Sequence, residues 1–407
     1  MKCRPLTYHR RVLQVSVSLL LFVILVFEYR RESRCSVPQK HQFLISNSNQ
    51  STPSVSTSHI RDNLRLWDLI DNYPFNDDVT TYGEGEGYFI YECSVVCGGW
   101  ADQIKGTIFA YMIANLTGRQ FKARYLRPDC GMTNYLIPNR VNWVIPRSWS
   151  PSEHNCLYHN ELGNHRLKLD LPNVDFKDRY QIGSTSCNIG KWNLNYINAL
   201  LQSRVYHREL AWTRHLTPSD VIGVVYRRLF RLHPRLQRVL DGVLYGTLAT
   251  PRHRLVCIHV RLGYEAFHSD GVEESRNSLR NLPEIWKWIS HQAASEYDKV
   301  FVMSDSQEVI HSARNQSFGD RLVSIPGSII HSDKFPKKDM SEVCDGVERL
   351  VLEHHLSMNC DVFVRGHSGL SVIAAAVRGS DQGLYCLHSD GTIEPCNRND
   401  FSTFEWF

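Results

Sequence analysis

The strongest constraint on the fold is a run of alternating strand and helix patterns between residues 254 and 379. Short β-branched runs, such as "RLVCIHVRLG" at 254–263 and "KVFVMSD" at 299–305, are each followed by a segment with helical apolar spacing. Strands that read as continuous apolar runs are typical of parallel sheets buried between helices. The pattern therefore predicts a doubly wound α/β domain with strands at 254–263, 299–305, 321–327 and 361–366 and helices at 279–294, 306–315, 345–360 and 368–379.

A second α/β unit is predicted upstream. "GYFIYECSVV" at 87–96 reads as a strand, and "CGGW" interrupts it before a helical pattern over 101–118 that ends at Gly118. A strand, a glycine turn and a helix form the usual opening of a nucleotide-binding α/β domain. Because 407 residues exceed what one core holds, we expect two facing Rossmann-type domains, 66–245 and 246–407.

A single long helix is predicted over 216–244. Thr217 would cap it, Pro218 would occupy its first position, and Asp220 would complete a capping box. The arginines on its outer face are expected to be solvated surface.

The amino terminus has the pattern of a membrane anchor. Four Lys or Arg residues in 1–11 precede the run "VLQVSVSLLLFVILVF" at 12–27, which carries no charge. No small-residue cleavage site follows, so a retained transmembrane signal-anchor is favoured over a cleaved signal peptide. The basic residues before the span would leave 1–11 in the cytosol and place the rest in a lumen. The polar segment 28–65 would then be a stem.

Cysteine usage is consistent with an oxidising lumen. Ten of the 12 cysteines lie between Cys93 and Cys396, and they could form disulfides whose pairing the spacing does not reveal. A zinc site is the weaker reading, because the C-x3-C pair of Cys93 and Cys97 has no compact second pair. In a lumen, the sequons at Asn49, Asn115 and Asn315 become candidate N-glycosylation sites.

Polar residues gather where the predicted parallel strands end, which is the edge at which such sheets bind ligands. Arg261, two residues beyond His259, has a planar guanidinium that would suit a diphosphate; a salt bridge to an acid is the alternative. Ser304 and Asp305 would either bind a nucleotide or cap a helix. The segment "GHSGLS" at 366–371 adds hydroxyls and a helix N-terminus, which favour phosphate.

Together these motifs resemble the fucosyltransferase superfamily with a shared H-x-R motif, which comprises α1,2-, α1,6- and protein O-fucosyltransferases. "HVR" at 259–261, "VMSDS" at 302–306 and "FVRGHSGLS" at 363–371 are similar to its three C-terminal motifs, in the same order. "CGGWADQ" at 97–103 resembles its first glycine loop. The resemblance implies a GT-B-like, inverting enzyme that uses GDP-fucose as donor and needs neither a metal nor another cofactor.

On matching positions, the resemblance implies that Arg261 holds the diphosphate and stabilises the departing GDP, while His259 supports the donor site. Asp305 would contact the guanosine. Catalysis would then rest on charge stabilisation at the breaking glycosidic bond. The chain has no D-x-D pair, which metal-dependent glycosyltransferases usually need. The remaining implied donor contacts are Ser304, His367, Ser368, Ser371, Gly98, Gly99 and Gln103.

Two departures from the family pattern leave the acceptor chemistry open. Tyr264 stands where family members carry an acid, with Glu265 one place later. In the glycine loop, Ala101 and Asp102 replace the usual Gly and Asn. Asp102 and Glu265 are therefore the candidate general bases, and a structural hydrogen bond is the alternative role for each.

The predicted function is transfer of L-fucose from GDP-fucose to a glycan or glycoprotein, by a single-pass type II protein of the Golgi membrane. Two alternatives stay open: a catalytically silent glycan-binding protein of the same fold, or a glycosyltransferase with a UDP-sugar or GDP-mannose as donor. The net charge of +4 is too small to indicate a nucleic-acid binder. The acceptor, the linkage and the oligomeric state, a homodimer included, are not determined by the sequence.

Overall fold

The structure is a computed structural model that describes residues 87–94, 97–146, 149–250, 252–263, 276–330 and 339–400. All of them belong to one compact unit, Val55–Phe407. The predicted anchor and stem, Asn49, Tyr264 and Glu265 lie outside the described residues. Within the described ranges, no helix combines the length and the apolar character that crossing a bilayer requires.

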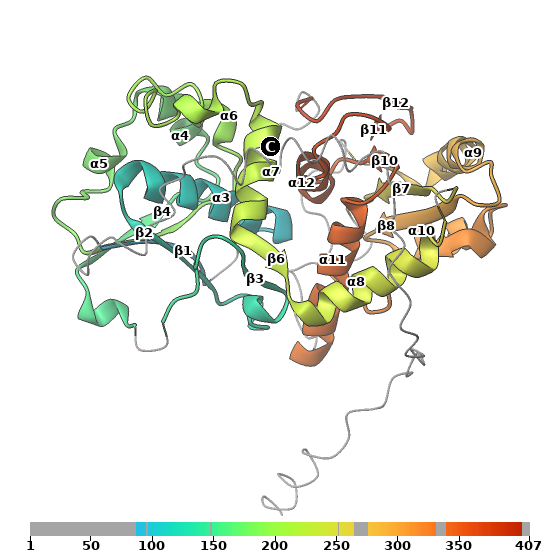
Figure 1. The fold of residues 1–407 in the computed structure, drawn as a ribbon, viewed down its shortest axis with the longest axis horizontal. Helices are drawn as coiled ribbons and strands as arrows, with labels where there is room; N and C mark the ends of the chain where they lie inside the picture. The colour runs from blue at the N-terminus through green and yellow to red at the C-terminus, as the bar shows by residue number, and fades with distance from the viewer. Residues whose placement is uncertain are drawn as a thin grey trace, which may run out of the picture. The chain divides into compact units, whose positions relative to one another are not determined.

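The first sheet is parallel and has the strand order β2-β1-β5-β4. β1 (Tyr88–Cys93) pairs with β2 (Gln120–Tyr125) and with β5 (Cys187–Lys191), which in turn pairs with β4 (Cys156–Asn160). α3 (Trp100–Thr117) follows β1 and lies beside this sheet (Figure 1). Its last turn closes at a glycine with a positive φ of 70°. The predicted strand, glycine turn and helix are thus confirmed.

The second sheet has the order β12-β11-β10-β7-β8-β9. β7 (Leu255–Val260) lies near its centre, between β10 (Val362–Arg365) and β8 (Lys299–Ser304), and both pairings are parallel. β9 (Leu322–Val323) extends the sheet on one side and is shorter than the predicted strand at 321–327. The carboxyl ends of β7, β8 and β10 therefore meet at one edge of the sheet.

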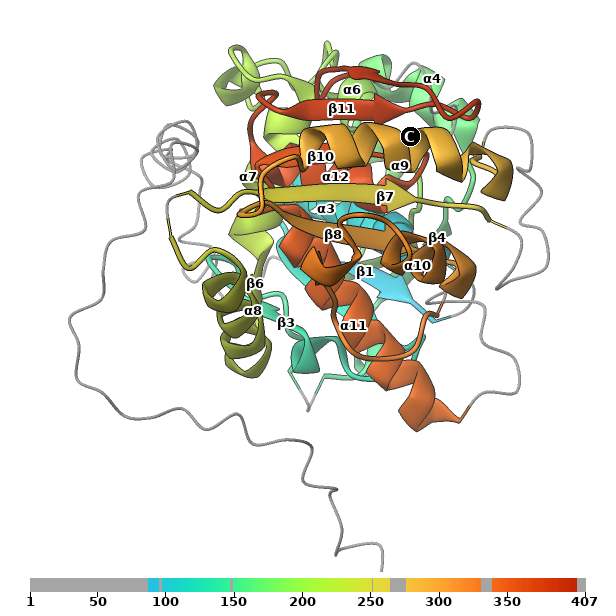
Figure 2. The same ribbon diagram turned by 90° about the vertical axis from the view of Figure 1, so that its right-hand side faces the viewer.

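Helices cover both faces of the second sheet. Val256, Ile258 and Val260 of β7 belong to a core that also contains residues of α9 and α10, whereas Leu255 and Cys257 share a core with residues of α11 and α12. Figure 2 shows the two pairs of helices on opposite sides of β7 and β8. The predicted doubly wound sheet is confirmed, with α9 at Leu282–Gln292, α10 at Gln307–Arg314, α11 at Met340–Ser357 and α12 at Gly369–Arg378.

Two strands beyond α12 are not part of the predicted pattern. β11 (Leu384–Leu387) pairs with β10 in parallel, and β12 (Ile393–Pro395) is antiparallel to β11. The remaining short elements are β3 (Leu136–Pro138), α4 (His165–Asp170), α5 (Phe176–Arg179), α6 (Ile197–Leu200) and the 3-10 helices Met132–Asn134, Pro151–Glu153, Leu171–Asn173, Ala211–Thr213, Leu279–Asn281 and Gly319–Arg321.

The single helix predicted over 216–244 is wrong. The chain forms α7 (Pro218–Leu229), then β6 (Phe230–Leu232), then α8 (Pro234–Thr247). The ring of Pro234 has no N–H to donate and would clash with the preceding helical turn, so a helix cannot run through it. The intervening residues instead pair with β3 in a two-stranded antiparallel sheet.

The start of that helix agrees with the prediction, but its arginine face does not. Thr217 Oγ1 accepts the Asp220 N–H at 3.2 Å, and Asp220 Oδ2 accepts the Thr217 N–H at 2.9 Å, which confirms the capping box. Arg228, expected in solvent, is 1% exposed, and its Nε donates to the hydroxyl of Tyr111 at 3.0 Å. Arg227 is half-buried and donates to a carbonyl of α12.

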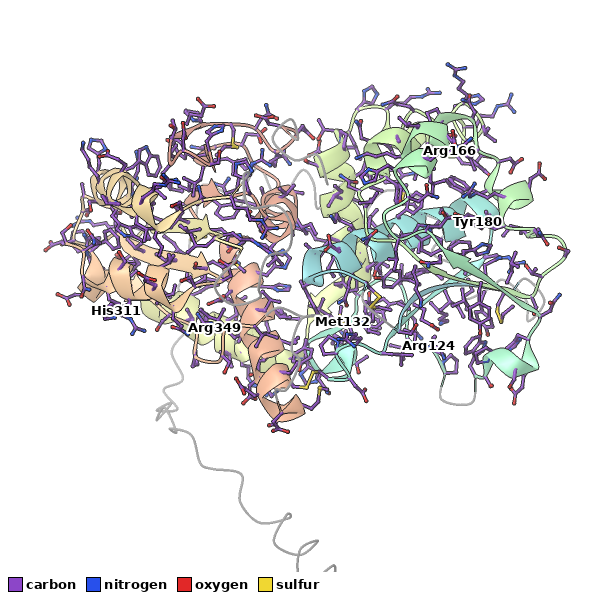
Figure 3. All side chains as sticks on the ribbon, turned by 180° about the vertical axis from the view of Figure 1, so that it is seen from behind. Arg124, Met132, Arg166, Tyr180, His311 and Arg349 are labelled. Atoms are coloured by element: carbon purple, nitrogen blue, oxygen red, sulfur yellow. A yellow bond between two sulfur atoms is a disulfide. The ribbon has the colours of Figure 1, made fainter. Side chains whose placement is uncertain are left out.

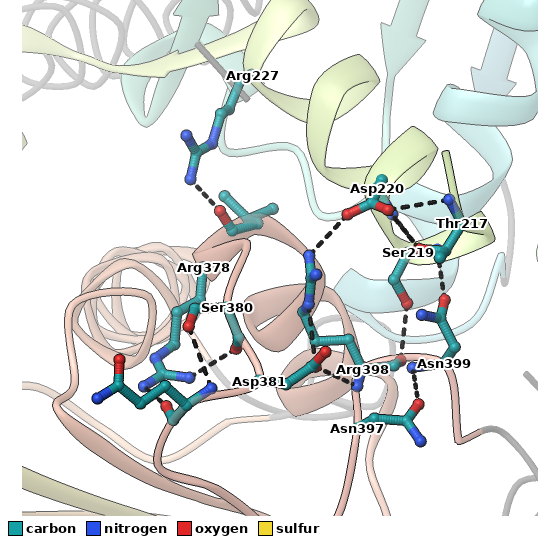
Figure 4. Close-up of polar contacts among 12 residues, drawn as sticks. Thr217, Ser219, Asp220, Arg227, Arg378, Ser380, Asp381, Asn397, Arg398 and Asn399 are labelled. Atoms are coloured by element: carbon teal, nitrogen blue, oxygen red, sulfur yellow. Dashed lines mark hydrogen bonds and ion pairs between the residues drawn. The ribbon is translucent and has the colours of Figure 1, made fainter. Parts of the chain in front are cut away.

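α7 packs directly against α12. A Cβ on Gly223 would lie 2.6 Å from the carbonyl oxygen of Ala376, so only glycine allows this approach. The segment after β12 adds polar contacts: Arg398 Nη1 pairs with Asp220 Oδ1 at 2.8 Å, and Ser219 Oγ donates to the Arg398 carbonyl at 2.7 Å (Figure 4). Both halves of the chain thus contribute to one packed unit, and the domain boundary at residue 245 stays a prediction.

All ten cysteines between Cys93 and Cys396 form disulfides, whose sulfur atoms are drawn in Figure 3. Cys93 bonds to Cys97, so this C-x3-C pair is a disulfide and not half of a zinc site. Cys130 bonds to Cys344 across 214 residues of sequence. The other pairs are Cys156–Cys187, Cys257–Cys360 and Cys386–Cys396.

Two of the three sequons lie on the described surface. Asn115 is exposed near the end of α3, and Asn315 is exposed directly after α10. The Asn115 side chain donates to the carbonyl of Tyr111 one helical turn earlier, at 3.1 Å. Glycosylation at both positions stays a prediction.

Candidate active site

The candidate site forms at the carboxyl end of β7. All six residues of this strand are buried, so the sheet fixes the position of the residues just beyond it. Arg261 comes directly after the strand, and its side chain is 15% exposed. Its Nε lies 3.9 Å from Asp305 Oδ2, which is longer than a direct hydrogen bond. The guanidinium thus reaches the edge of the sheet beside one carboxylate, with part of its surface in solvent.

Asp305, which follows β8, holds the turn after Arg261. Its Oδ1 accepts the Leu262 N–H and its Oδ2 accepts the Gly263 N–H, both at 2.9 Å. Gly263 has a positive φ of 88°, which glycine adopts without strain. Asp305 therefore shapes the main chain next to the guanidinium, a role that no sequence pattern indicates. Its contact with guanosine stays a prediction.

His259 is the second-last residue of β7 and is 3% exposed. Burial, reinforced by the charge of Arg261 and opposed by Asp305, lowers the pKa of His259 from 6.5 to about 3. The imidazole is therefore neutral near neutral pH and can act there through hydrogen bonds but not as a cation. Its Nδ1 is buried and has no hydrogen-bond partner in the described part of the chain.

Ser304 is buried at the end of β8, and its predicted capping role belongs to a neighbour. Ser306 is the N-cap of α10, because its Oγ accepts the Glu308 N–H at 3.2 Å. Ser304 Oγ accepts the Ser306 N–H at 3.1 Å and so supports that cap. The structure thus brings Ser304 to the site edge with a local structural contact.

β10 and α12 bring the "GHSGLS" residues to the same edge. A Cβ on Gly366 would overlap the carbonyl oxygen of His259, so only glycine lets these strand ends approach. Ser371 Oγ lies 3.0 Å from the carbonyl oxygens of both Gly366 and Ser368 and donates to this pair. Ser368 occupies the N-cap of α12 without a capping hydrogen bond, and its buried Oγ has no partner among the described residues. His367, between them, is half-buried.

Chemically, this edge is suited to an anion. A guanidinium donates two parallel hydrogen bonds to a phosphate, and a helix N-terminus adds main-chain N–H groups and a partial positive charge. Arg261 supplies the first, and α12 with the Ser368 hydroxyl supplies the second. The sequence prediction that these residues gather at one edge is confirmed by the positions of β7, β8 and β10.

The glycine loop lies at the end of β1, in the first sheet. Asp102 caps α3: its Oδ2 accepts the Gly99 N–H at 2.8 Å. Its Oδ1 pairs with Lys105 Nζ, also at 2.8 Å, while the side chain stays 34% exposed. Both oxygens of this candidate base are therefore already engaged by the helix that it begins.

Gly98 and Gln103 complete this loop. Gly98 has a positive φ of 85°, and a Cβ there would overlap the Asp102 carboxylate. Gln103 is 1% exposed, and its Nε2 donates to the Gly98 carbonyl at 3.4 Å. The Cys93–Cys97 disulfide closes the chain just before the loop. These contacts fix the loop from within, and the predicted contacts of Gly98, Gly99 and Gln103 with the donor stay predictions.

Two buried residues near the candidate site, Asn277 and His354, are not indicated by any pattern in the sequence. Asn277 is 2% exposed, and its main-chain N–H donates to the Arg261 carbonyl at 3.2 Å. His354 of α11 is fully buried, and burial, followed by its neighbours His355 and His259, lowers its pKa well below the ordinary value. Neither residue follows a predicted strand, so neither is found among the residues at the strand ends.

The fold is that of a fucosyltransferase-like glycosyltransferase. An Arabidopsis thaliana FUT1 mutant in complex with GDP is similar with a TM-score of 0.52 and 14% identity, over 86% of this chain and 82% of that one. The fucosyltransferase NodZ from Bradyrhizobium aligns with a TM-score of 0.45 and 13% identity, over 76% of this chain and 98% of its own. No family model matches the sequence, and no curated protein is similar to it in sequence. At such low identity, the likeness to FUT1 shows the fold alone.

Proposed function

We propose that this protein transfers L-fucose from GDP-fucose to a glycan or glycoprotein acceptor. The fold shared with a GDP-bound FUT1 supports this class of reaction. The observation that carries the proposal is the edge of the second sheet, where Arg261 reaches solvent at the end of β7 and Ser368 begins α12 at the end of β10. These groups together would bind a diphosphate.

The proposed reaction is a direct displacement that inverts the anomeric carbon. The acceptor oxygen bonds to C1 of fucose while the bond from C1 to the β-phosphate oxygen breaks, and the acceptor proton passes to a base. Arg261 would stabilise the negative charge that develops on the departing GDP. A fixed guanidinium supplies there the positive charge that a metal ion supplies in other glycosyltransferases. Neutral His259 would support the donor through a hydrogen bond.

The proposed base is Glu265 or Asp102. Because both oxygens of Asp102 are engaged with Gly99 and Lys105, this carboxylate would have to leave its helix cap before accepting a proton. That cost favours Glu265, which lies outside the described residues, as the group that takes the acceptor proton.

A catalytically silent glycan-binding protein of the same fold is the second candidate. The engaged carboxylate of Asp102 favours it, since the described part of the glycine loop then offers no ready base. The position of Arg261 argues against it, because a partly exposed guanidinium at this edge suits a phosphate.

We also propose a luminal position for the folded part, anchored to the Golgi membrane by the predicted span at 12–27. The five disulfides support this proposal, since they persist in oxidising compartments and are rare in the cytosol. In sealed microsomes, an epitope at the C-terminus should resist protease until detergent is added. Digestion without detergent would contradict the proposed orientation.

A thermal shift experiment on the full chain tests the donor. Without added Mn²⁺, GDP and GDP-fucose should raise the melting temperature, and UDP should not. A ligand at 100 times its Kd stabilises the folded state by about 2.7 kcal/mol, which is a shift of several degrees for a protein of this size. Equal stabilisation by UDP, or a strict need for Mn²⁺, would contradict the proposal. Binding of GDP-fucose without transfer to any glycan on an array would favour the silent alternative.

A further inference from the structure

We propose that Asn277 is a specificity-determining residue that accepts a hydrogen bond from the nucleoside of the bound nucleotide, an inference that rests on the proposed function. Asn277 lies at the candidate site edge, because its main-chain N–H donates to the Arg261 carbonyl at 3.2 Å. A Cβ on Gly366 would lie 4.0 Å from Asn277 Oδ1. The amide is therefore placed where the ends of β7 and β10 meet.

The orientation of the Asn277 amide is fixed by its donor group. Its Nδ2 donates to the carbonyl of His388 at 2.6 Å. A flipped amide would set its oxygen against that carbonyl oxygen, and two acceptors repel each other. The oxygen Oδ1 therefore points away from the 388 carbonyl and lies toward Gly366.

Asn277 Oδ1 is a buried acceptor that the described part of the chain leaves unsatisfied. A buried polar atom without a partner costs about 1–3 kcal/mol. The hydrogen bond to the His388 carbonyl does not by itself require an unsatisfied acceptor, since a serine or a lysine could also donate to that carbonyl. A hydrogen bond accepted from a ligand explains why an amide, with one donor group and one acceptor, occupies this place.

The neighbours of Asn277 suggest which part of the ligand it meets. Arg261 offers only donors, which suit phosphate oxygens but cannot distinguish one nucleoside diphosphate from another. Asn277 Oδ1 is an acceptor and would select a ligand that carries an N–H or O–H at that point. Because its side chain is 2% exposed, such a bond forms away from water, where it is strongest. A guanine N–H and a ribose hydroxyl share this chemistry.

Asn281 is a matched control for Asn277. Its Nδ2 donates to the carbonyl of Ser389 at 2.7 Å, the residue after the one that Asn277 holds. Both amides therefore anchor the same turn, but Asn281 lies at the start of α9 and is half-buried. Asn277→Ala and Asn281→Ala both remove an anchor of the turn, and only the first removes the acceptor at the site edge.

Isothermal titration of the wild type and both variants with GDP tests the inference. Asn277→Ala should weaken GDP binding about 10- to 100-fold, which corresponds to the cost of an unmade buried hydrogen bond. Asn281→Ala should stay within about twofold of the wild type. Equal loss in both variants, or no loss in Asn277→Ala, would overturn the inference.

Four GDP analogues, each lacking one donor, identify the contact: 1-methyl-GDP, IDP without the 2-amino group, 2′-deoxy-GDP and 3′-deoxy-GDP. One of them should bind the wild type more weakly than GDP and be insensitive to Asn277→Ala. A loss of the same size for all four in Asn277→Ala would mean that the amide supports the turn alone, and the inference would fail. A wild type that does not bind GDP at all would instead refute the proposed function.

Discussion

The carboxyl ends of the parallel strands differ between the two sheets in how they use polar side chains. At the first sheet, the acidic groups are paired within the protein: Glu92 with Arg124, Glu161 with Arg179, and Asp102 with Lys105. At the second sheet, buried polar atoms of His259, Asn277 and Ser368 have no partner among the described residues. Buried polar atoms without a described partner also occur near the first edge, for example the Tyr91 hydroxyl and Trp100 Nε1. The two edges differ instead in their carboxylates, because Asp305 at the second edge accepts two main-chain N–H groups.

The two strand ends resemble each other in sequence, but their charged residues have different roles. At each edge a strand is followed along the chain by a glycine and then by a helix. Both edges also carry charged residues near the end of the strand. At the first edge these residues hold the loop and the helix cap in place. At the second edge Asp305 performs that task through the Leu262 and Gly263 N–H groups, and the Arg261 side chain beside it is 15% exposed.

The largest expected effect comes from removing the guanidinium of Arg261 at the second edge. Arg261→Ala should lower fucose transfer by about 1000-fold or more, because charge on the departing diphosphate loses its main counter-charge. Arg261→Lys should not restore it, since an ammonium cannot donate two parallel hydrogen bonds. Transfer rates with radiolabelled GDP-fucose measure both.

Arg124→Ala is the matched control at the first edge. It should leave GDP affinity unchanged and lower the melting temperature, because Glu92 would stay buried without its partner. If Arg261→Ala transferred fucose at the wild-type rate, or if Arg124→Ala lost GDP binding, the proposal that only the second edge binds the donor would be contradicted.

A second prediction concerns the close approach of β7 and β10. Gly366→Ala should destabilise the fold by about 1–3 kcal/mol or more and weaken GDP binding, since its Cβ would overlap the His259 carbonyl. Gly242→Ala in α8, where no atom lies within 4 Å of the added Cβ, should stabilise by up to about 1 kcal/mol. Chemical denaturation measures both, and a neutral Gly366→Ala would show that the strand ends can separate.

A third prediction sharpens the assignment of the base. Asp102→Asn should cost about 1 kcal/mol of stability through a weakened helix cap and less than about tenfold in transfer. Glu265→Gln should lower transfer about 100-fold or more. Paired measurements of turnover and melting temperature separate the two roles. The reverse ranking would assign the base to the glycine loop of the first sheet.

The smallest effect is a pH dependence, and it compares the buried His259 of the second sheet with the half-buried His159 of the first. Burial lowers the pKa of His259 to about 3 and that of His159 to about 4. In the unfolded chain both groups titrate near 6.5, so below that pH the unfolded state takes up protons first. Their contribution to stability is therefore present above pH 6.5 and is lost as the pH falls toward 4.

At pH 5.5 His259→Gln and His159→Gln should flatten this acid loss by about the same amount, because both folded-state pKa values lie well below that pH. Only as the pH falls below about 4 should the larger shift of His259 separate the two variants. The expected difference from the wild type is about 1 kcal/mol at pH 5.5. Denaturant titrations at pH 7.5, 6.5 and 5.5 measure it. An unchanged pH profile in His259→Gln would show that this imidazole is not buried as the structure places it.

The sequence predicts the parts of the fold that depend on local patterns. Buried strands such as β7 and β8 stand out as apolar runs, and the residues directly after them, Arg261 and Asp305, are found by position alone. The same local reasoning fails before Pro234, where the helical spacing of apolar residues continues although the helix is broken. The residues of β6 between the two helices pair with β3, which lies far away in the sequence. A helical period does not show which residues find a partner strand elsewhere.

The features of the site that escaped prediction, Asn277 itself and the way Asp305 holds the turn after Arg261, depend on distant contacts. Asn277 is anchored by a carbonyl 111 residues away, and Asp305 holds N–H groups 43 and 42 positions earlier. No spacing rule reveals such pairs. The buried Arg228 is missed for the same reason, since its partner Tyr111 belongs to α3, 117 residues before it.

The Cys130–Cys344 bond sets a condition on how the chain is made. Cys130 leaves the ribosome 214 residues before its partner, a delay of about 10 to 40 s at ordinary rates of synthesis. Cys156 and Cys187 emerge during that interval and are native partners of each other. Premature pairing of Cys130 with either one is therefore the expected error of biosynthesis, and an enzyme that exchanges disulfides would raise the yield of correctly paired protein.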